Sequence, residues 1–248
     1  MKKTVLVTGG GSGLGKGACL ELVKRGHEVI ATTENEEQAE LLRQQAPQLI
    51  VEKLDITTND IEKVSKWDID VLANIAGMGQ SGPIADIPID RVRKILEVNV
   101  TGTIAITQKV LQKMIPKGAG RILIMSSIGG LVTVPSFGAY TMTKHALEAV
   151  GKTMREELAP QGIDVALINP GPYDTGFNDR MADSMWSWFN DDALQADNAL
   201  MFKEIGAGIT SNQLDPTEVE QLIADLVEAE QTEVQNLIPK NILESFGA

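Results

Sequence analysis

Tyr140 and Lys144 are four residues apart in a stretch whose apolar residues have helical spacing. On a helix this spacing places both side chains on one face, one turn apart. A free tyrosine titrates near pH ~10, but a cation one turn away in a cleft favours the phenolate. We therefore expect the pKa of Tyr140 to fall, so that it can give a proton to a carbonyl oxygen or take one from an alcohol. A surface helical pair is the alternative if the motif stands alone.

Ser127 precedes Tyr140 by thirteen residues and follows the apolar run 121–125. It is expected at the carboxyl end of a strand, where ligands bind in open α/β sheets. Its hydroxyl could hold the substrate oxygen, and the adjacent Ser126 is the alternative until the family resemblance described below selects Ser127. A hydrolase with a nucleophilic serine is disfavoured, because the chain has no G-x-S-x-G motif and its two histidines are expected to lie away from Ser127.

Five glycines fall within the seven residues from Gly9 to Gly15, directly after the apolar run 5–7. Such a loop allows positive φ angles and brings backbone N–H groups to a phosphate at a helix N-terminus. Gly10 to Lys16 nearly matches a triphosphate-binding loop, but Gly17 stands where that loop needs a hydroxyl for magnesium. The spacing T-G-x-x-x-G-x-G favours a dinucleotide, and a flexible turn without a ligand is the remaining alternative.

Short apolar runs alternate with helical segments along the chain and must position these groups. Continuously apolar strands separated by helices predict a parallel sheet covered on both faces. The predicted fold is α/β: a doubly wound, Rossmann-like, three-layer single domain over residues 1–248. Predicted strands lie at 5–7, 28–32, 49–51, 70–74, 121–125 and 164–168, a helix begins at 215–216, and residues 234–238 add a last strand.

Composition excludes several classes of protein. With 248 residues, 43% of them hydrophobic and 23% charged, the chain is expected to be globular. A net charge of −12 opposes binding to nucleic acids and anionic membranes, and no apolar run approaches the ~20 residues of a membrane span. The single cysteine, Cys19, fits a reducing compartment. We expect a cytoplasmic protein with no nucleic-acid partner, no membrane partner and no metal site.

Several motifs, in order over roughly the first 175 residues, make the chain resemble the short-chain dehydrogenase/reductase family. Any one of them is weak, but six at compatible spacing are specific. Ile75 departs from the family pattern, which has a second Asn there. The motifs are T-G-x-x-x-G-x-G from Thr8 to Gly15, Asp55, N-I-A-G from Asn74 to Gly77, Asn99, Ser127 followed by Y-x-x-x-K from Tyr140 to Lys144, and P-G-x-x-x-T from Pro170 to Thr175.

The resemblance implies roles for these residues. Tyr140 would be the acid/base, Ser127 would hold the substrate oxygen, and Asn99 would anchor a proton relay through Lys144. Lys144 would also bind the nicotinamide ribose. Asp55 and Ile56 would bind the adenine, and Thr175 the carboxamide. The complete set implied for the cofactor is Gly9, Gly11, Ser12, Gly13, Leu14, Gly15, Thr33, Glu34, Asp55, Ile56, Asn74, Ala76, Gly77, Tyr140, Lys144, Pro170, Gly171 and Thr175.

The end of the second predicted strand bears on the choice between NAD and NADP. Thr33 is expected beside the ribose 2′-hydroxyl, followed by Glu34. Ser12 occupies the loop position where many NADP-users carry a basic residue, and Lys16 is expected to point along its helix. A carboxylate there repels a 2′-phosphate. NAD is therefore expected, with NADP not excluded.

Residues 172–212 are rich in Met, Trp and Phe and have no single period. Two helices packed on the body are one interpretation. A long insertion after a strand's carboxyl end would also lie over the ligand crevice, so we favour an apolar substrate lid. Trp186 and Trp188 are expected to be mobile without ligand and to become buried when cofactor and substrate bind, and closure of the lid would supply the apolar wall of the pocket. Arg180 and Lys203 are its only basic residues, which predicts a mainly apolar substrate.

Together these features predict an NAD(P)-dependent oxidoreductase that transfers a hydride between a nicotinamide cofactor and an alcohol/carbonyl pair. A regulator that senses the dinucleotide without turnover is the alternative, although a sensor has no need of the proton path. The expected partner is a small molecule, and the resemblance implies a homo-oligomer, either a dimer or a tetramer.

Overall fold

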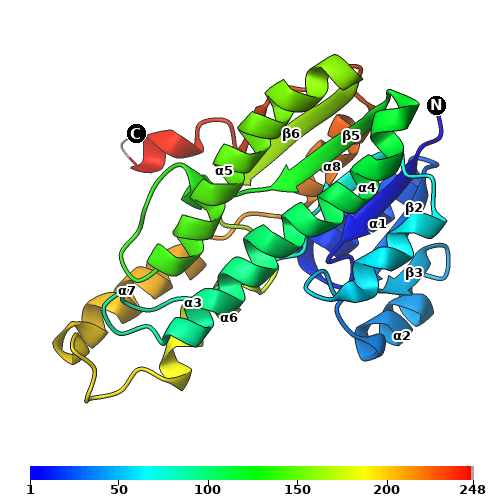
Figure 1. The fold of residues 1–248 in the computed structure, drawn as a ribbon. Coiled ribbons are helices and arrows are strands. Elements are labelled where there is room, and N and C mark those ends of the chain that lie inside the picture. Colours follow the sequence, from blue (N-terminus) through cyan, green and yellow to red (C-terminus); the bar gives the residue numbers. More distant parts are fainter. Residues whose placement is uncertain (247–248) are drawn as a thin grey trace.

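A seven-stranded sheet forms the centre of the molecule in the computed structural model, which describes residues 1–246 (Figure 1). The strand order is β3-β2-β1-β4-β5-β6-β7, and every neighbouring pair is parallel. The predicted doubly wound α/β fold and its last strand are confirmed. The strands are β1 (Thr4–Thr8), β2 (Glu28–Thr33), β3 (Ile50–Lys53), β4 (Val71–Asn74), β5 (Gly120–Met125), β6 (Ile163–Pro170) and β7 (Gln235–Ile238).

Helices cover both faces of the sheet and complete three layers. One core cluster joins the strands to α1 and α8, and a second joins them to α4 and α5. In Figure 1, α6 and α7 project from one end of the molecule, near the start of α5. The helices are α1 (Gly13–Lys24), α2 (Glu36–Gln45), α3 (Ile89–Leu96), α4 (Thr103–Lys117), α5 (Gly138–Leu158), α6 (Phe177–Asp183), α7 (Ala199–Thr210) and α8 (Thr217–Glu228).

The side chains of β1 show why its sequence is apolar without alternation. Val5 and Val7 pack into the cluster on the α1 side, whereas Leu6, between them, packs into the cluster on the α4 side. Successive side chains of a strand point to opposite faces, and here both faces are covered. All three residues are fully buried. A continuous apolar run is therefore the pattern that this position requires.

The order of the strands creates the ligand crevice. β1 lies between β2 and β4. The chain first adds β2 and β3 on one side of β1, and it then adds β4, β5, β6 and β7 on the other side. The loops after β1 and β4 leave the sheet at the same edge, the carboxyl ends of the strands, where open α/β sheets form their ligand crevice. β6 extends to Pro170 because β7 pairs with its last residues, Pro170 opposite Ile238.

The amino end of β6 is held by a charged cluster around Asp164. Its Oδ2 accepts hydrogen bonds from Arg121 Nε at 2.8 Å and Thr232 Oγ1 at 2.9 Å, and its Oδ1 pairs with Arg155. The buried Arg121 guanidinium also donates to the Leu226 carbonyl at the end of α8. This cluster joins β5, β6, α5 and α8 at the end of the sheet opposite the crevice.

We predict that Asp164→Ala lowers the free energy of unfolding by about 3–5 kcal/mol, because it leaves a buried guanidinium without its carboxylate. Ligand binding at the opposite end of the sheet should be unchanged in the folded variant. Chemical denaturation measures the stability, and calorimetric titration measures the binding. A loss below 1 kcal/mol would show that the cluster contributes little to stability.

Candidate functional site

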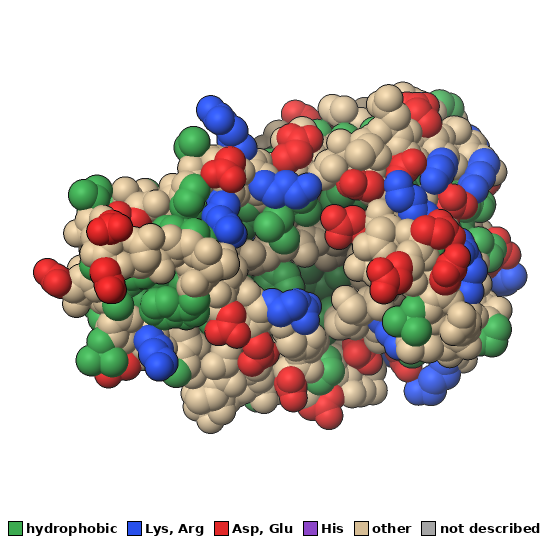
Figure 2. All heavy atoms as spheres, turned by 90° about the horizontal axis from the view of Figure 1, so that it is seen from below, with side chains coloured by type: hydrophobic (Ala, Val, Ile, Leu, Met, Phe, Trp, Pro, Cys, Tyr) green, Lys and Arg blue, Asp and Glu red, His purple; other side chains and the backbone are tan. Residues whose placement is uncertain are grey.

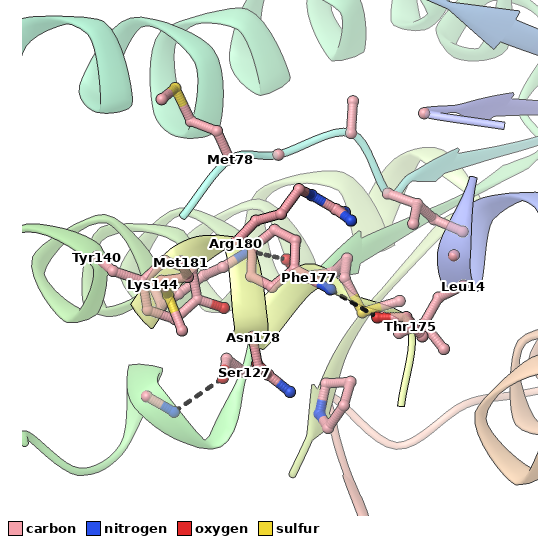
Figure 3. Close-up of a pocket in the computed structure, with 18 of the residues that line it drawn as sticks. Leu14, Met78, Ser127, Tyr140, Lys144, Thr175, Phe177, Asn178, Arg180 and Met181 are labelled. Atoms are coloured by element: carbon pink, nitrogen blue, oxygen red, sulfur yellow. Dashed lines mark hydrogen bonds between the residues drawn. The ribbon is translucent and has the colours of Figure 1, made fainter. Parts of the chain in front are cut away.

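A pocket of about 690 Å³ occupies the crevice, a size suited to a small-molecule or cofactor site. All predicted cofactor-binding residues line it except Thr33 and Asn74, and Ser127 lines it as well. Figure 2 shows the surface hollowed here, with a hydrophobic interior and charged side chains around the rim. Figure 3 shows Ser127, Tyr140, Lys144 and Thr175 gathered around the pocket. The sequence motifs therefore converge in space.

The glycine loop is shaped by close approach of backbone to backbone. A Cβ on Gly15 would lie 2.1 Å from the Gly9 carbonyl oxygen, so only glycine fits there. Gly9 has a φ of +69°, and a Cβ on it would lie 2.8 Å from Ala76 Cα. Both features are those of a phosphate cradle at the start of a helix. The shape of the loop therefore fits the phosphates of a dinucleotide.

The Thr8 hydroxyl holds the loop after β4 in place. Its Oγ1 accepts hydrogen bonds from the backbone N–H groups of Ile75 and Ala76, both at 3.0 Å. Thr8 is buried beneath the glycine loop. The motif contains this threonine, but the sequence reasoning assigned it no role, because its partners are distant in the chain.

Ser127, Tyr140 and Lys144 come together at the base of the pocket. Tyr140 and Lys144 lie one turn apart on α5, as predicted, and both are buried. The Tyr140 hydroxyl hydrogen-bonds to Ser127, and Lys144 Nζ donates to the Met125 carbonyl at 2.8 Å. A Cβ on Gly151 would lie 2.7 Å from Leu167 Cδ2, so this glycine lets α5 approach β6 closely.

The expected fall in the pKa of Tyr140 is wrong for the structure as it stands. Burial raises the pKa of Tyr140 to about 12, although its hydrogen bond with Ser127 acts in the opposite direction. Burial also lowers the pKa of Lys144 to about 8. The ammonium is itself desolvated and faces the Met125 carbonyl, so it does not offset the desolvation of the phenol. Tyr140 is therefore a protonated phenol at neutral pH.

Asn99 lies in a π-helical segment, Glu97–Gly102, between α3 and α4. Both polar atoms of its side-chain amide form hydrogen bonds. Oδ1 accepts a hydrogen bond from the Met78 backbone N–H at 2.8 Å. Nδ2 donates to the Met78 carbonyl at 2.9 Å and to Thr143 Oγ1 at 3.0 Å. The side chain thus joins the loop after β4 to α5. It does not line the pocket, and its role in a proton relay stays a prediction.

Thr33 and Asn74 were predicted to bind the cofactor, but their side chains do not line the pocket. Thr33 is buried, and its hydroxyl donates to the Asn35 carbonyl. Asn74 donates from Nδ2 to Thr107 Oγ1 on α4 at 3.0 Å. Each is the last residue of a strand, and its side chain points into the protein rather than over the sheet edge. The residues that follow, Glu34 and Ile75, line the pocket instead.

The two residues predicted to bind the adenine lie together in the pocket. Asp55 and Ile56 both line it. Asp55 Oδ1 accepts hydrogen bonds from the Thr57 backbone and hydroxyl, at 2.8 and 2.7 Å, which fixes the carboxylate. Ile56 is buried against Gly102, whose Cβ would lie 2.9 Å from Ile56 Cγ1. A fixed carboxylate beside an apolar surface can bind an amino group on a flat ring.

Glu148 forms a buried network behind Ser127 that the sequence reasoning missed. It lies one turn beyond Lys144 on α5 and is only 5% exposed. Its Oε1 accepts from Asn169 Nδ2 at 2.6 Å, and its Oε2 accepts from Gln235 Nε2 at 2.7 Å. Asn169 Nδ2 also donates to the Ser127 carbonyl at 3.3 Å. A carboxylate on a helix thus positions the backbone of Ser127 through Asn169.

The 172–212 segment contains packed helices and also lines the pocket. Met185, Phe189 and Phe202 form a small core of their own. Trp186 is 41% exposed, and Trp188 packs against Gly82, where a Cβ would lie 2.3 Å from the indole. Neither tryptophan lines the pocket of the ligand-free protein. Their burial on binding of cofactor and substrate stays a prediction.

The pocket wall comes from other residues of the same segment. Phe177 and Met181 on α6, and Ile205 and Ile209 on α7, line the pocket. Phe177 packs against Tyr140, with ring centroids 5.9 Å apart. The composition of the segment marked it as apolar, but the absence of a single period hid which side chains face the crevice. Arg180 also lines the pocket from α6.

Residues 1–246 show two further features. No helix in this range combines the length and apolar character needed to cross a bilayer. The same range contains no group of three or more His, Cys, Asp or Glu side chains arranged to hold a metal ion.

Comparisons with known proteins agree with this architecture. Residues 3–186 match the family model described as short chain dehydrogenase. An uncharacterised oxidoreductase of Bacillus subtilis is 36% identical over 95% of this chain and 88% of its own length. An NADPH-dependent 3-dehydrocapnine reductase of Ornithobacterium rhinotracheale is 35% identical over 68% of this chain and 65% of its own. A short-chain dehydrogenase structure from Streptomyces avermitilis has a TM-score of 0.81 at 27% identity, covering 98% of this chain and 90% of its own.

The family model covers most of the chain, and the B. subtilis relative extends the match to nearly all of it. The motifs within the matched range are the ones that meet in the pocket: the glycine loop, Ser127, Tyr140 and Lys144. The resemblance and the fold therefore lead to one conclusion. The chain belongs to the short-chain dehydrogenase/reductase family of oxidoreductases.

Proposed function

We propose that this protein reduces a carbonyl group on a mainly apolar small molecule, with a nicotinamide dinucleotide as cofactor. The observation that carries the proposal is the convergence of Ser127, Tyr140 and Lys144 at the base of one pocket that also contains the glycine loop. The cofactor would supply the hydride. A regulator without turnover would not need a buried tyrosine hydrogen-bonded to a serine in this position.

The protonation state of Tyr140 fits the role of proton donor in the reduction. A phenol with a pKa of about 12 holds its proton at neutral pH and can donate it to the oxygen of a carbonyl as negative charge develops there. Ser127 Oγ, fixed by the Gly129 backbone N–H at 3.0 Å, would hold the same oxygen. Lys144 would stabilise the phenolate that remains and bind the nicotinamide ribose.

The pocket wall supports an apolar substrate. Phe177, Met181, Ile205 and Ile209 face the space beside Tyr140 and offer no hydrogen-bonding groups. The 172–212 segment would act as a lid that excludes water from the site of hydride transfer.

The surroundings of Glu34 support NAD rather than NADP. Glu34 lines the pocket at the end of β2, where the ribose of the adenosine is expected. The basic side chains nearby are engaged elsewhere: Lys16 donates to Gln45 at 2.6 Å, and Arg43 pairs with Glu36 at 2.6 Å. The O. rhinotracheale relative is NADPH-dependent, so this preference needs its own measurement.

We predict that Tyr140→Phe reduces turnover by at least ~10²-fold and leaves NADH binding unchanged, because it removes only the transferable proton. Steady-state rates on a panel of aldehydes and ketones, with NADH binding followed by fluorescence, test this. Adjacent serines provide a matched pair. Ser127→Ala should lose turnover, whereas Ser126→Ala should not, because Ser126 Oγ has no hydrogen-bond partner in the structure. Near-normal rates for Tyr140→Phe would contradict the mechanism.

We predict a higher kcat/KM with NADH than with NADPH, and a shift of at least ~10-fold toward NADPH in Glu34→Arg, because the new guanidinium pairs with the 2′-phosphate. Glu37→Arg is the control, since it makes the same charge change on α2 at an exposed residue that does not line the pocket. A wild-type preference for NADPH would refute the assignment.

We predict that Met181→Ala changes the preference among carbonyl substrates, because Met181 lines the pocket. Trp188→Ala should instead lower the free energy of unfolding by up to ~3–5 kcal/mol and leave that preference unchanged, because Trp188 packs outside the pocket. Denaturation curves and kcat/KM ratios for two carbonyls of different size distinguish the two effects. Unchanged selectivity in Met181→Ala would argue against the assigned wall.

A further inference from the structure

Arg180 is a basic side chain of the pocket whose position no motif explains. It projects from α6 and is exposed. Figure 3 shows its side chain extending across the pocket instead of away from it. Its guanidinium has no ion pair or hydrogen bond with any residue between 1 and 246. In a chain with a net charge of −12, an unpaired guanidinium in a ligand pocket indicates an anionic partner.

The neighbours of the guanidinium locate that partner. A Cβ on Gly176 would lie 2.9 Å from Arg180 Nη1, so the guanidinium lies over the residue next to Thr175. Thr175 in turn touches the glycine loop, since a Cβ on Gly13 would lie 3.3 Å from Thr175 Cβ. Arg180 therefore lies at the end of the pocket where the glycine loop can bind phosphate.

The glycine loop contributes no positively charged side chain at this end. Among the pocket-lining residues, Glu34 and Asp55 are acidic, and Lys144 is held against the Met125 carbonyl. Lys94 also lines the pocket, but from α3. Backbone N–H groups alone would have to balance two phosphate charges. A guanidinium matches phosphate oxygens bidentately and adds a full charge.

We propose that Arg180 binds the pyrophosphate of the dinucleotide and so attaches the 172–212 segment to the bound cofactor. This inference rests on the proposed function. Because α6 also carries Phe177 and Met181, binding of the pyrophosphate by Arg180 draws the apolar wall over the site. Cofactor binding thereby orders the surface that the substrate meets.

Calorimetric titration with ADP-ribose tests the proposal, because this probe carries the pyrophosphate without the nicotinamide. Arg180→Gln should weaken ADP-ribose binding by about tenfold, the loss expected for one charge-assisted pair. It should also reduce the salt dependence of binding. The affinity of Arg180→Lys for ADP-ribose should lie between that of the wild-type protein and that of Arg180→Gln. Lys203→Gln is the matched control: it removes a basic residue of the same segment that does not line the pocket.

Two results would overturn the inference. Unchanged ADP-ribose affinity in Arg180→Gln would show that Arg180 does not bind the pyrophosphate. If that variant raised KM for 4-carboxybenzaldehyde but not for benzaldehyde, the anion would be a substrate carboxylate instead. Failure of the wild-type protein to bind ADP-ribose, NADH or NADPH would refute the proposed function, which separates the two failures. Equal melting temperatures for all variants would show that the comparison is made between folded proteins.

Discussion

The close approach of two loops, one after β1 and one after β4, is the constraint on which the site depends. Gly9 rests on Ala76, Gly15 rests on the Gly9 carbonyl, and the Thr8 hydroxyl ties the second loop to the first. A side chain at Gly9 would push the two loops apart, whereas a side chain at Gly15 would clash with the carbonyl of Gly9 within the first loop. The two loops are distant in the chain, so their contact requires that β1 and β4 have paired.

Much of the fold and part of the site could be predicted from the sequence, because local patterns carry the information. Apolar runs specify strands that are buried on both faces, and Val5 to Val7 illustrate this. The positions of Tyr140 and Lys144 follow from the pitch of a helix. Such rules need no knowledge of distant residues.

The errors arose where a distant neighbour decides the outcome. Thr33 and Asn74 end their strands as expected, but the direction of each side chain depends on a partner elsewhere, such as Thr107 for Asn74. The pKa of Tyr140 depends on how deeply α5 is buried, which the Tyr-Lys spacing does not encode. The Glu148 network was missed for the same reason, since its members come from α5, β6 and β7.

The distribution of tryptophan has an optical consequence. Of three tryptophans, Trp186 and Trp188 lie in the 172–212 segment, while Trp67 lies under Lys66 on another part of the surface. The half-exposed indole of Trp186 is beside Phe189, with ring centroids 6.0 Å apart. Intrinsic fluorescence is therefore weighted toward this one segment. Tryptophan emission overlaps the absorption of a reduced nicotinamide. Energy transfer from the segment to a bound reduced cofactor would therefore report the distance between them without any attached dye.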